Sequence, residues 1–363
     1  MESKTRGIGA YVARLPFVVG HQLSDEHVVL GAFDETARSI VHGALQWDDP
    51  VPDTVIAQGM ADYMSRALRE ESVDRIVVVG YGPDGPGRAT LLADYLTRTM
   101  DVATTVLHVD GGTWRRHTPG GWTPPQQIPD GAVDMVARGR PAPAASRQDL
   151  MDSVTPLKNP LFEPLDPDKA RELANLSPVQ RLSVAVGAME ALAAGRTDDP
   201  GRMQTLAHAV TTDSMVREAV IAHTIADKVH DGHVDALVRT FRAAPRDLRP
   251  TLALTAAAAA FLAAWHPPLV WGLLNHADPE TNLTYLLTRS LEEGAKPQRF
   301  RPVLVQAARD DIDHAQQAWE ADHPGAPQDR APWSTHDRLD AQHQPAPTSP
   351  QQARPTTPDG PGL

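Results

Sequence analysis

The residues best placed to do chemistry lie in the glycine-rich segment GYGPDGPG, which follows an apolar stretch and precedes a helical one. Gly80, Gly82 and Gly85 satisfy the pattern G-x-G-x-x-G. In dinucleotide-binding folds, such glycines let backbone N–H groups approach a pyrophosphate at the N-terminus of a helix. Arg88 is a nearby cation able to face a phosphate, and Asp110 stands where a ribose-binding carboxylate could lie. These residues form the candidate cofactor-binding site, and the cofactor itself is unknown.

The same segment also has the composition of a structural turn. Pro83 and Pro86 have no backbone N–H, so they remove two donors from a phosphate cradle. Asp84 would place a negative charge beside a phosphate, and Asp110 follows Gly85 by more than the usual gap of about 20 residues. Gly, Pro and Asp are typical residues of surface turns. Two hypotheses therefore stay open: nucleotide binding by this segment, or a turn without a ligand.

Histidine and aspartate gather in a second segment, which contains His223, Asp227, His230, Asp231, His233 and Asp235. The first three are spaced to share one face of a helix, and imidazole with carboxylate suits zinc or iron. The alternative is the polar end of a helix that turns at Gly232, with solvated histidines. A late helical segment carries a further acidic group: Asp310, Asp311, Asp313 and His314. Such a density of acid is typical of a solvated helix face.

Two tryptophans offer a stacking surface. Trp114 and Trp122 flank Arg115, Arg116 and His117, and such a group could stack on a base or a sugar. The alternative interpretation is a hairpin whose tryptophans pack on the sheet. The sequence contains no G-x-S-x-G elbow, Walker A loop, H-E-x-x-H motif or spaced zinc-finger pattern.

The first 120 residues must supply the elements that position these side chains. Four segments have the composition of strands: residues 27–33, 39–47, 75–81 and 104–109. Helical periodicity predicts helices at 54–69, with Asp53 as N-cap, and at 88–100. The Asp-Gly-Gly turn after the fourth strand predicts a return strand. This order predicts a three-layer α/β domain over residues 1–150, with a mixed sheet parallel in its middle and antiparallel at its edges.

The remaining ordered chain is predicted to be an all-α domain of helical hairpins over residues 171–322, after a Pro-rich linker at 151–170. The expected helices are 181–194, 202–210, 213–229, 234–243, an alanine-rich core helix ending near a buried Trp265, 279–293 and 302–321. Asp278 is expected to cap the helix at 279–293, whose first residue is Pro279. Residues 323–363 are rich in Pro and Gln and poor in large apolar residues, so we expect a disordered tail.

Composition narrows the class of protein. The chain has 363 residues, of which 41% are hydrophobic, enough for a sizeable core. Acidic residues exceed basic ones by 46 to 34, and the formal net charge of −12 argues against generic nucleic-acid binding. The absence of cysteine excludes disulfides and cysteine nucleophiles and fits a cytoplasmic location. The N-terminal segment lacks the cleavage site of a signal peptide, and His-Pro-Pro interrupts the most apolar window at 251–274. No membrane segment is therefore predicted.

Several segments together resemble the actinobacterial domain-of-unknown-function family numbered 4192. They are LPFVVG at 15–20 with HVVLG at 27–31, VDGGTWR at 109–115, ASRQDL at 145–150, and the stretch 262–297 with its tryptophan. The resemblance spans residues 8 to 310. The family often has a Cys pair, which this chain lacks, and HPP replaces its usual alanine-glycine stretch. Because the family has no established activity, the resemblance implies a shared fold and lineage and assigns no catalytic residue.

These observations predict a non-enzymatic binding or scaffold module with protein partners. The alternative hypothesis is a nucleotide-binding enzyme or sensor that uses residues 80–87.

Overall fold

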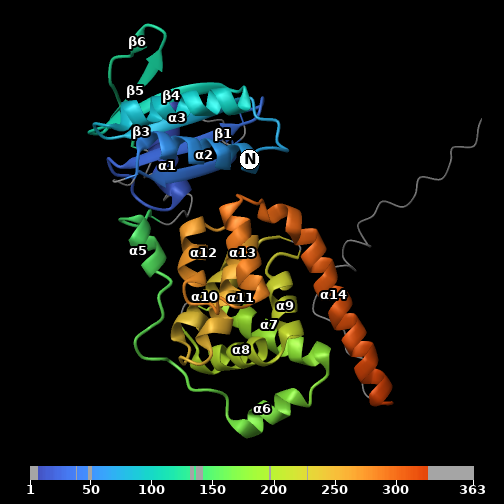
Figure 1. Cartoon of the computed structure of the whole chain (residues 1–363). Helices are drawn as coiled ribbons and strands as arrows, with labels where there is room; N and C mark the ends of the chain where they lie inside the picture. The colour runs from blue at the N-terminus through green and yellow to red at the C-terminus, as the bar shows by residue number, and fades with distance from the viewer. Residues whose placement is uncertain are drawn as a thin grey trace, which may run out of the picture.

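The computed structural model describes residues 7–37, 39–47, 51–130, 135, 142–195, 198–226 and 228–325, which form an α/β part followed by a helical part (Figure 1). In Figure 1 the α/β part lies above the helical part, and α14 runs down one side of the latter. This arrangement confirms the predicted fold class. The expected tail lies, from residue 326 on, outside the described residues, as does Asp227.

The α/β part is built on a seven-stranded sheet in the order β2-β1-β3-β4-β5-β6, with β7 paired to β5. The strands are β1 (His27–Phe33), β2 (Ser39–Gln46), β3 (Arg75–Tyr81), β4 (Ala103–Asp110), β5 (Thr113–Thr118), β6 (Gly121–Trp122) and β7 (Gln126–Gln127). Only the pairing of β3 with β4 is parallel among the described strands. The four predicted strands are confirmed to within one residue at each end, and so is the hairpin after β4.

Helices α2 (Asp53–Ala67) and α3 (Gly85–Met100) cover one face of the sheet. Leu30 and Val78 point toward this face and are fully buried there. Asp53 is not the N-cap that the sequence suggests, because the cap position is Pro52. The Asp53 carboxylate instead accepts a hydrogen bond of 2.7 Å from the indole nitrogen of Trp47. It thereby satisfies the polar group of a buried side chain.

Helix α1 (Gly7–Val19) covers the opposite face and completes the three layers. Val12 and Leu15 are buried in the apolar cluster that this face forms. The sequence pattern does not predict this helix, because Pro16 lies inside it and removes one helical N–H. The Pro16 carbonyl still accepts a hydrogen bond of 2.8 Å from the N–H of Gly20, which closes the last turn.

The helical part contains ten helices among the described residues. They are α5 (Arg147–Asp152), α6 (Pro167–Ala174), α7 (Pro178–Ala194), α8 (Pro200–Thr212), α9 (Ser214–His223), α10 (Asp231–Ala243), α11 (Arg249–Leu262), α12 (Pro267–Leu274), α13 (Asn282–Glu292) and α14 (Pro297–Asp322). The alanine-rich α11 is buried along most of its length, as expected of a core helix. Within the described part of the chain, no helix combines the length and apolarity needed to span a bilayer.

Three details of the helical part differ from the sequence predictions. Helix α9 ends at His223 rather than near residue 229. Helix α13 begins at Asn282, with Thr281 as its N-cap, so Pro279 precedes the helix. Asp278 lies earlier, where its carboxylate accepts a hydrogen bond of 3.0 Å from the N–H of Glu280. Asp278 therefore closes the preceding turn and does not cap the helix.

Two further predictions concern Trp265 and the start of the last helix. The prediction of a buried Trp265 is wrong, because the side chain is only half-buried against the core and its indole N–H donates to the Asp231 carboxylate at 2.9 Å. The last helix, predicted to begin at residue 302, begins at Pro297, whose fixed φ suits a first helical turn.

The segment expected to be a linker follows the surface of the helical part. The N–H groups of Leu157 and Leu161 donate to carbonyls at the end of α10, each at 2.8 Å. Val154 and Phe162 are buried in the core of the helical part. These contacts tie the segment to the helices along its length.

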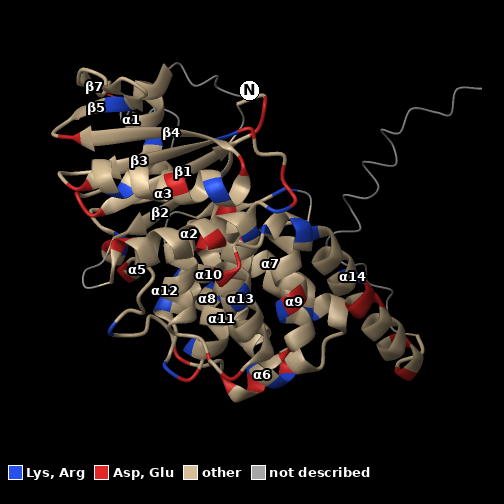
Figure 2. Ribbon diagram, turned by 45° about the horizontal axis from the view of Figure 1, so that its top comes forward, with Lys and Arg blue, Asp and Glu red and all other residues tan. Residues whose placement is uncertain are grey.

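The two parts contact each other where the α13–α14 turn meets α2. Lys296 forms an ion pair of 2.7 Å with Glu71, and Arg299 pairs with both Glu70 and Glu71. The hydrogen bond from Lys296 holds the pKa of the Glu71 carboxyl below its usual value. A Cβ atom on Gly294 would lie 2.8 Å from the Ala67 side chain, so the turn and α2 approach closely. Elsewhere, basic and acidic residues are interspersed along both parts (Figure 2).

Candidate functional site

The predicted glycine-rich site joins β3 to α3, and two of its glycines face each other. A Cβ atom on Gly80 would lie 2.1 Å from the carbonyl oxygen of Gly85. A Cβ atom on Gly85 would lie 2.7 Å from the carbonyl carbon of Gly80. Both positions therefore require glycine because strand and helix meet here without room for a side chain.

Gly82 directs its polar groups into the fold. Its φ is +73°, and a Cβ atom there would lie 2.3 Å from the Cβ of Asp25. Its N–H donates to the Val109 carbonyl at 3.0 Å, and its carbonyl accepts from the N–H of Gly85 at 3.1 Å. The same carbonyl lies 2.8 Å from Nε2 of His108. These hydrogen bonds occupy the N–H groups of Gly82 and Gly85, which a phosphate cradle would need.

Arg88 and Asp110 lie apart from each other. The Arg88 side chain is 11% exposed, and its guanidinium lies 5.9 Å from the ring centroid of Trp47 and 3.9 Å from the Asp84 carboxylate. Asp110 lines a cleft of about 530 Å³ on the α1 side of the sheet, together with Asp25. The structure thus places the predicted residues around one turn but does not bring them together in one pocket. The prediction of a cofactor site at this turn stays a prediction.

The polar residues around Trp122 contact one another and the tryptophan ring. Nε of Arg115 donates to Nδ1 of His108 at 2.9 Å, so the His108 proton resides on Nε2, facing Gly82. The Arg115 guanidinium lies 5.3 Å from the centroid of the Trp122 ring, and the His117 ring lies 5.0 Å from it. The ring of Trp122 is therefore already in contact with two side chains of its own hairpin.

Trp114 belongs to the opposite face of the sheet. It pairs with Val109 across the β4–β5 ladder and is buried against α1, where its indole nitrogen would lie 3.1 Å from a Cβ atom on Gly9. Trp114 and Trp122 therefore pack on two different faces, as the hairpin interpretation expects, and do not form one stacking surface.

The histidine-rich segment forms a stack of rings. The His233 ring lies 4.6 Å from that of His230 and 5.7 Å from that of His223. Burial, and then the neighbouring histidines, lower the pKa of His233 to about 4. Among the residues that the structure describes, no group of three or more potential ligands is arranged to hold a metal.

The acidic group on α14 is exposed, as expected of a solvated helix face. It comprises Asp310, Asp311, Asp313 and His314.

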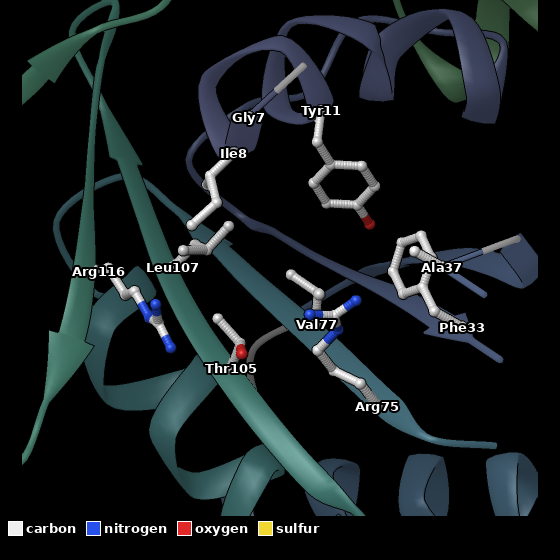
Figure 3. Close-up of a pocket in the computed structure, with 10 residues that line it drawn as sticks. All are labelled: Gly7, Ile8, Tyr11, Phe33, Ala37, Arg75, Val77, Thr105, Leu107 and Arg116. Atoms are coloured by element: carbon white, nitrogen blue, oxygen red, sulfur yellow. The ribbon is translucent and has the colours of Figure 1, made fainter. Parts of the chain in front are cut away.

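A pocket that the motifs do not mark lies between α1 and the sheet (Figure 3). This α1 pocket has a volume of about 250 Å³ and is lined by Gly7, Ile8, Tyr11, Phe33, Ala37, Arg75, Val77, Thr105, Leu107 and Arg116. Strand register explains the space. Val77 lies beside Thr105 in the β3–β4 pairing, so two small side chains line the pocket side by side on the sheet.

Two arginines flank the α1 pocket. Arg75 begins β3, and its guanidinium lies 6.0 Å from the centroid of the Phe33 ring. Arg116 is opposite Leu107 in the β4–β5 ladder. Figure 3 shows the two guanidinium groups on either side of Thr105. No carboxylate lines this pocket, and neither arginine forms an ion pair, within the part of the chain that the structure describes.

Tyr11 extends from α1 toward the sheet (Figure 3). Its hydroxyl oxygen is buried and has no hydrogen-bond partner among the described residues. Burial, and then the neighbouring Tyr81, raise the pKa of Tyr11, so the hydroxyl stays protonated near neutral pH. A Cβ atom on Gly31 would lie 2.3 Å from this oxygen, so Tyr11 occupies the space that the glycine leaves.

His42 is the second buried polar group beside Tyr11, with ring centroids 5.7 Å apart. Burial lowers the pKa of His42 to about 4, so the imidazole is neutral near pH 7. Its Nδ1 lies 2.8 Å from the Ser39 hydroxyl, and its Nε2 has no partner among the described residues.

One sequence signal does point to the α1 pocket. Arg75 has the same strand parity as Val77, and Arg116 has the same parity as Trp114, so both arginines lie on the α1 side of the sheet, where both are exposed. A cation in phase with buried residues is unusual for a half-buried strand.

In comparisons with protein-family models, curated proteins and solved structures, the chain matches none. The resemblance to the family numbered 4192 therefore stays a prediction.

Proposed function

We propose that this protein is a non-enzymatic binding module whose α/β part binds a small molecule in the α1 pocket. The observation that carries the proposal is a largely apolar pocket flanked by Arg75 and Arg116, neither of which has an ion-pair partner among the described residues. A concave, mostly apolar cavity with a few convergent polar groups is the usual form of a small-molecule site. The helical part, tied through Lys296 and Arg299 to the turn that follows α2, serves as the scaffold.

The alternative, nucleotide binding at the glycine-rich turn, has less support. The N–H groups of Gly82 and Gly85 are already bonded within the fold, and Arg88 covers Trp47. The close contact between β3 and α3 is enough to explain why Gly80 and Gly85 are glycines. Protein partners, a cytoplasmic location and membership of the family numbered 4192 remain part of the proposal, supported by composition and by the resemblance.

Methyl-labelled protein provides the test. Ile8 lines the α1 pocket, whereas Ile76 is buried on the other face of the sheet and Ile221 lies in the helical core. In a screen of small neutral and charged fragments by methyl NMR, binders should shift the Ile8 resonance and leave the other two unchanged. A screen in which no compound shifts Ile8 at millimolar concentration would contradict the proposal.

A matched pair of variants separates the α1 pocket from the rest of the surface. Thr105→Phe fills the pocket and should abolish the Ile8 shifts. Thr99→Phe adds the same ring at an exposed position of α3 and should leave them intact. Equal binding by both variants would place the fragments elsewhere.

A further inference from the structure

The side chains of the α1 pocket define a class of ligand, an inference that rests on the proposed function. We propose that the α1 pocket binds a small amphipathic carboxylate, such as an aromatic or branched aliphatic acid. The carboxylate lies between Arg75 and Arg116, and the apolar body contacts Ile8 and the sheet.

Charge is the first argument for an anion. Arg75 and Arg116 flank Thr105 from two different strands, and no carboxylate lines the pocket among the described residues. The chain as a whole has a formal net charge of −12, so carboxylate side chains that could pair with an arginine are abundant elsewhere in the sequence. The planar guanidinium donates two parallel N–H bonds to a carboxylate, which makes arginine well suited to this anion.

The start of α1 is the second argument. Gly7 and Ile8 belong to its first turn, which lies at the end of the pocket away from Arg75 and Arg116 (Figure 3). N–H groups there have no partner within the helix, and the helix dipole is positive. Both ends of the α1 pocket therefore favour a negatively charged ligand over a positively charged one.

Size and lining are the third argument. Ile8, Val77, Leu107 and Phe33 give the pocket an apolar surface. Its volume of about 250 Å³ is below the range of about 300–1,000 Å³ typical of ligand pockets, so a nucleotide is too large. A phosphorylated sugar would place hydroxyl groups against the apolar side chains, which costs free energy. A compact acid with an apolar body fits both constraints.

The test compares benzoate with benzamide, which has nearly the same shape and no charge. Titration of the full-length chain, followed by the Ile8 methyl resonance, should give a dissociation constant about tenfold lower for benzoate. Arg75 and Arg116 are exposed and share this tenfold preference, so Arg75→Gln and Arg116→Gln should each weaken benzoate binding about threefold and leave benzamide binding unchanged. Arg171→Gln, at an exposed position of α6, is the control and should change neither.

A further variant guards against misfolding. Arg75→Lys keeps the charge without the planar fork and should recover part of the affinity lost in Arg75→Gln. Each variant must retain the wild-type methyl spectrum away from the α1 pocket.

The outcomes separate this inference from the function on which it rests. Equal affinity for benzoate and benzamide overturns carboxylate recognition, although binding in the α1 pocket would stand. Inorganic phosphate that binds as tightly as benzoate also overturns it, because the site would then recognise charge alone. Fragments that bind without shifting Ile8 contradict the proposed function as well.

Discussion

Replacing Gly80 by alanine tests whether the glycine-rich turn is a structural contact. The new Cβ atom would lie 2.1 Å from the Gly85 carbonyl oxygen, whereas ordinary contact begins at 3.4 Å. Because the obstacle is backbone at the start of α3, relief requires helix and strand to separate by about 1 Å in a close-packed core. Overpacking of this kind costs about 1–3 kcal/mol, and a backbone obstacle places Gly80→Ala near about 3 kcal/mol.

Hydrogen exchange measures this loss in the α/β part alone. The free energy of opening at the Val78 amide, in the buried strand β3, should fall by about 3 kcal/mol in Gly80→Ala. Gly87→Ala is the matched control, because nothing lies within 4 Å of its Cβ position. Alanine in that helical turn should be neutral or stabilise by about 0.5–1 kcal/mol. A Gly80→Ala protein as stable as the Gly87→Ala protein would refute the packing argument.

Three further predictions test the local chemistry. The folded pKa of His42 is about 4 and its unfolded value is 6.5, so the unfolded state binds more protons between these values. Stability should therefore fall by up to about 3 kcal/mol as pH drops from 6.5 to 4, and His42→Gln should flatten this dependence in urea titrations. Thr281→Ala removes the cap that accepts from the N–H of Thr284 and should cost about 1 kcal/mol in the urea midpoint, whereas an unchanged midpoint would exclude the cap. Trp265→Phe removes the indole hydrogen bond to Asp231 and should lower the free energy of unfolding, measured by thermal unfolding, by about 1 kcal/mol. An unchanged melting temperature would show that this hydrogen bond does not stabilise the fold.

The sheet could be predicted from the sequence because its signals are local. The strand at His27–Phe33 is apolar after its first residue and buried at every position, as a strand covered on both faces should be. The Asp-Gly-Gly turn identified the hairpin that follows β4, since Gly111 and Gly112 both adopt positive φ.

Helix ends were harder to predict because several residues in a row had suitable chemistry. Asp278 and Thr281 are both good N-cap residues, and the tertiary packing of α13 selects the second. Helix α1 was missed because Pro16 is a helix breaker in isolation. Burial of Val12 and Leu15 against the sheet offsets that local cost.

The α1 pocket could not be predicted from motifs, because no single segment contains it. It depends on the register that aligns Val77 and Thr105 in a row across β3 and β4. It also depends on where α1 begins over that row. The glycine-rich turn shows the opposite case, in which a familiar pattern marks a tight strand–helix contact between Gly80 and Gly85.

Intermolecular NOEs between bound benzoate and the methyl-labelled protein show directly where the ligand binds. We expect NOEs from the benzoate ring protons to the methyl groups of Ile8 and Leu107, which line the α1 pocket. We expect none to Ile76 on the other face of the sheet or to Ile221 in the helical core. Saturating benzoate that gives NOEs only outside the α1 pocket would contradict carboxylate binding in this pocket.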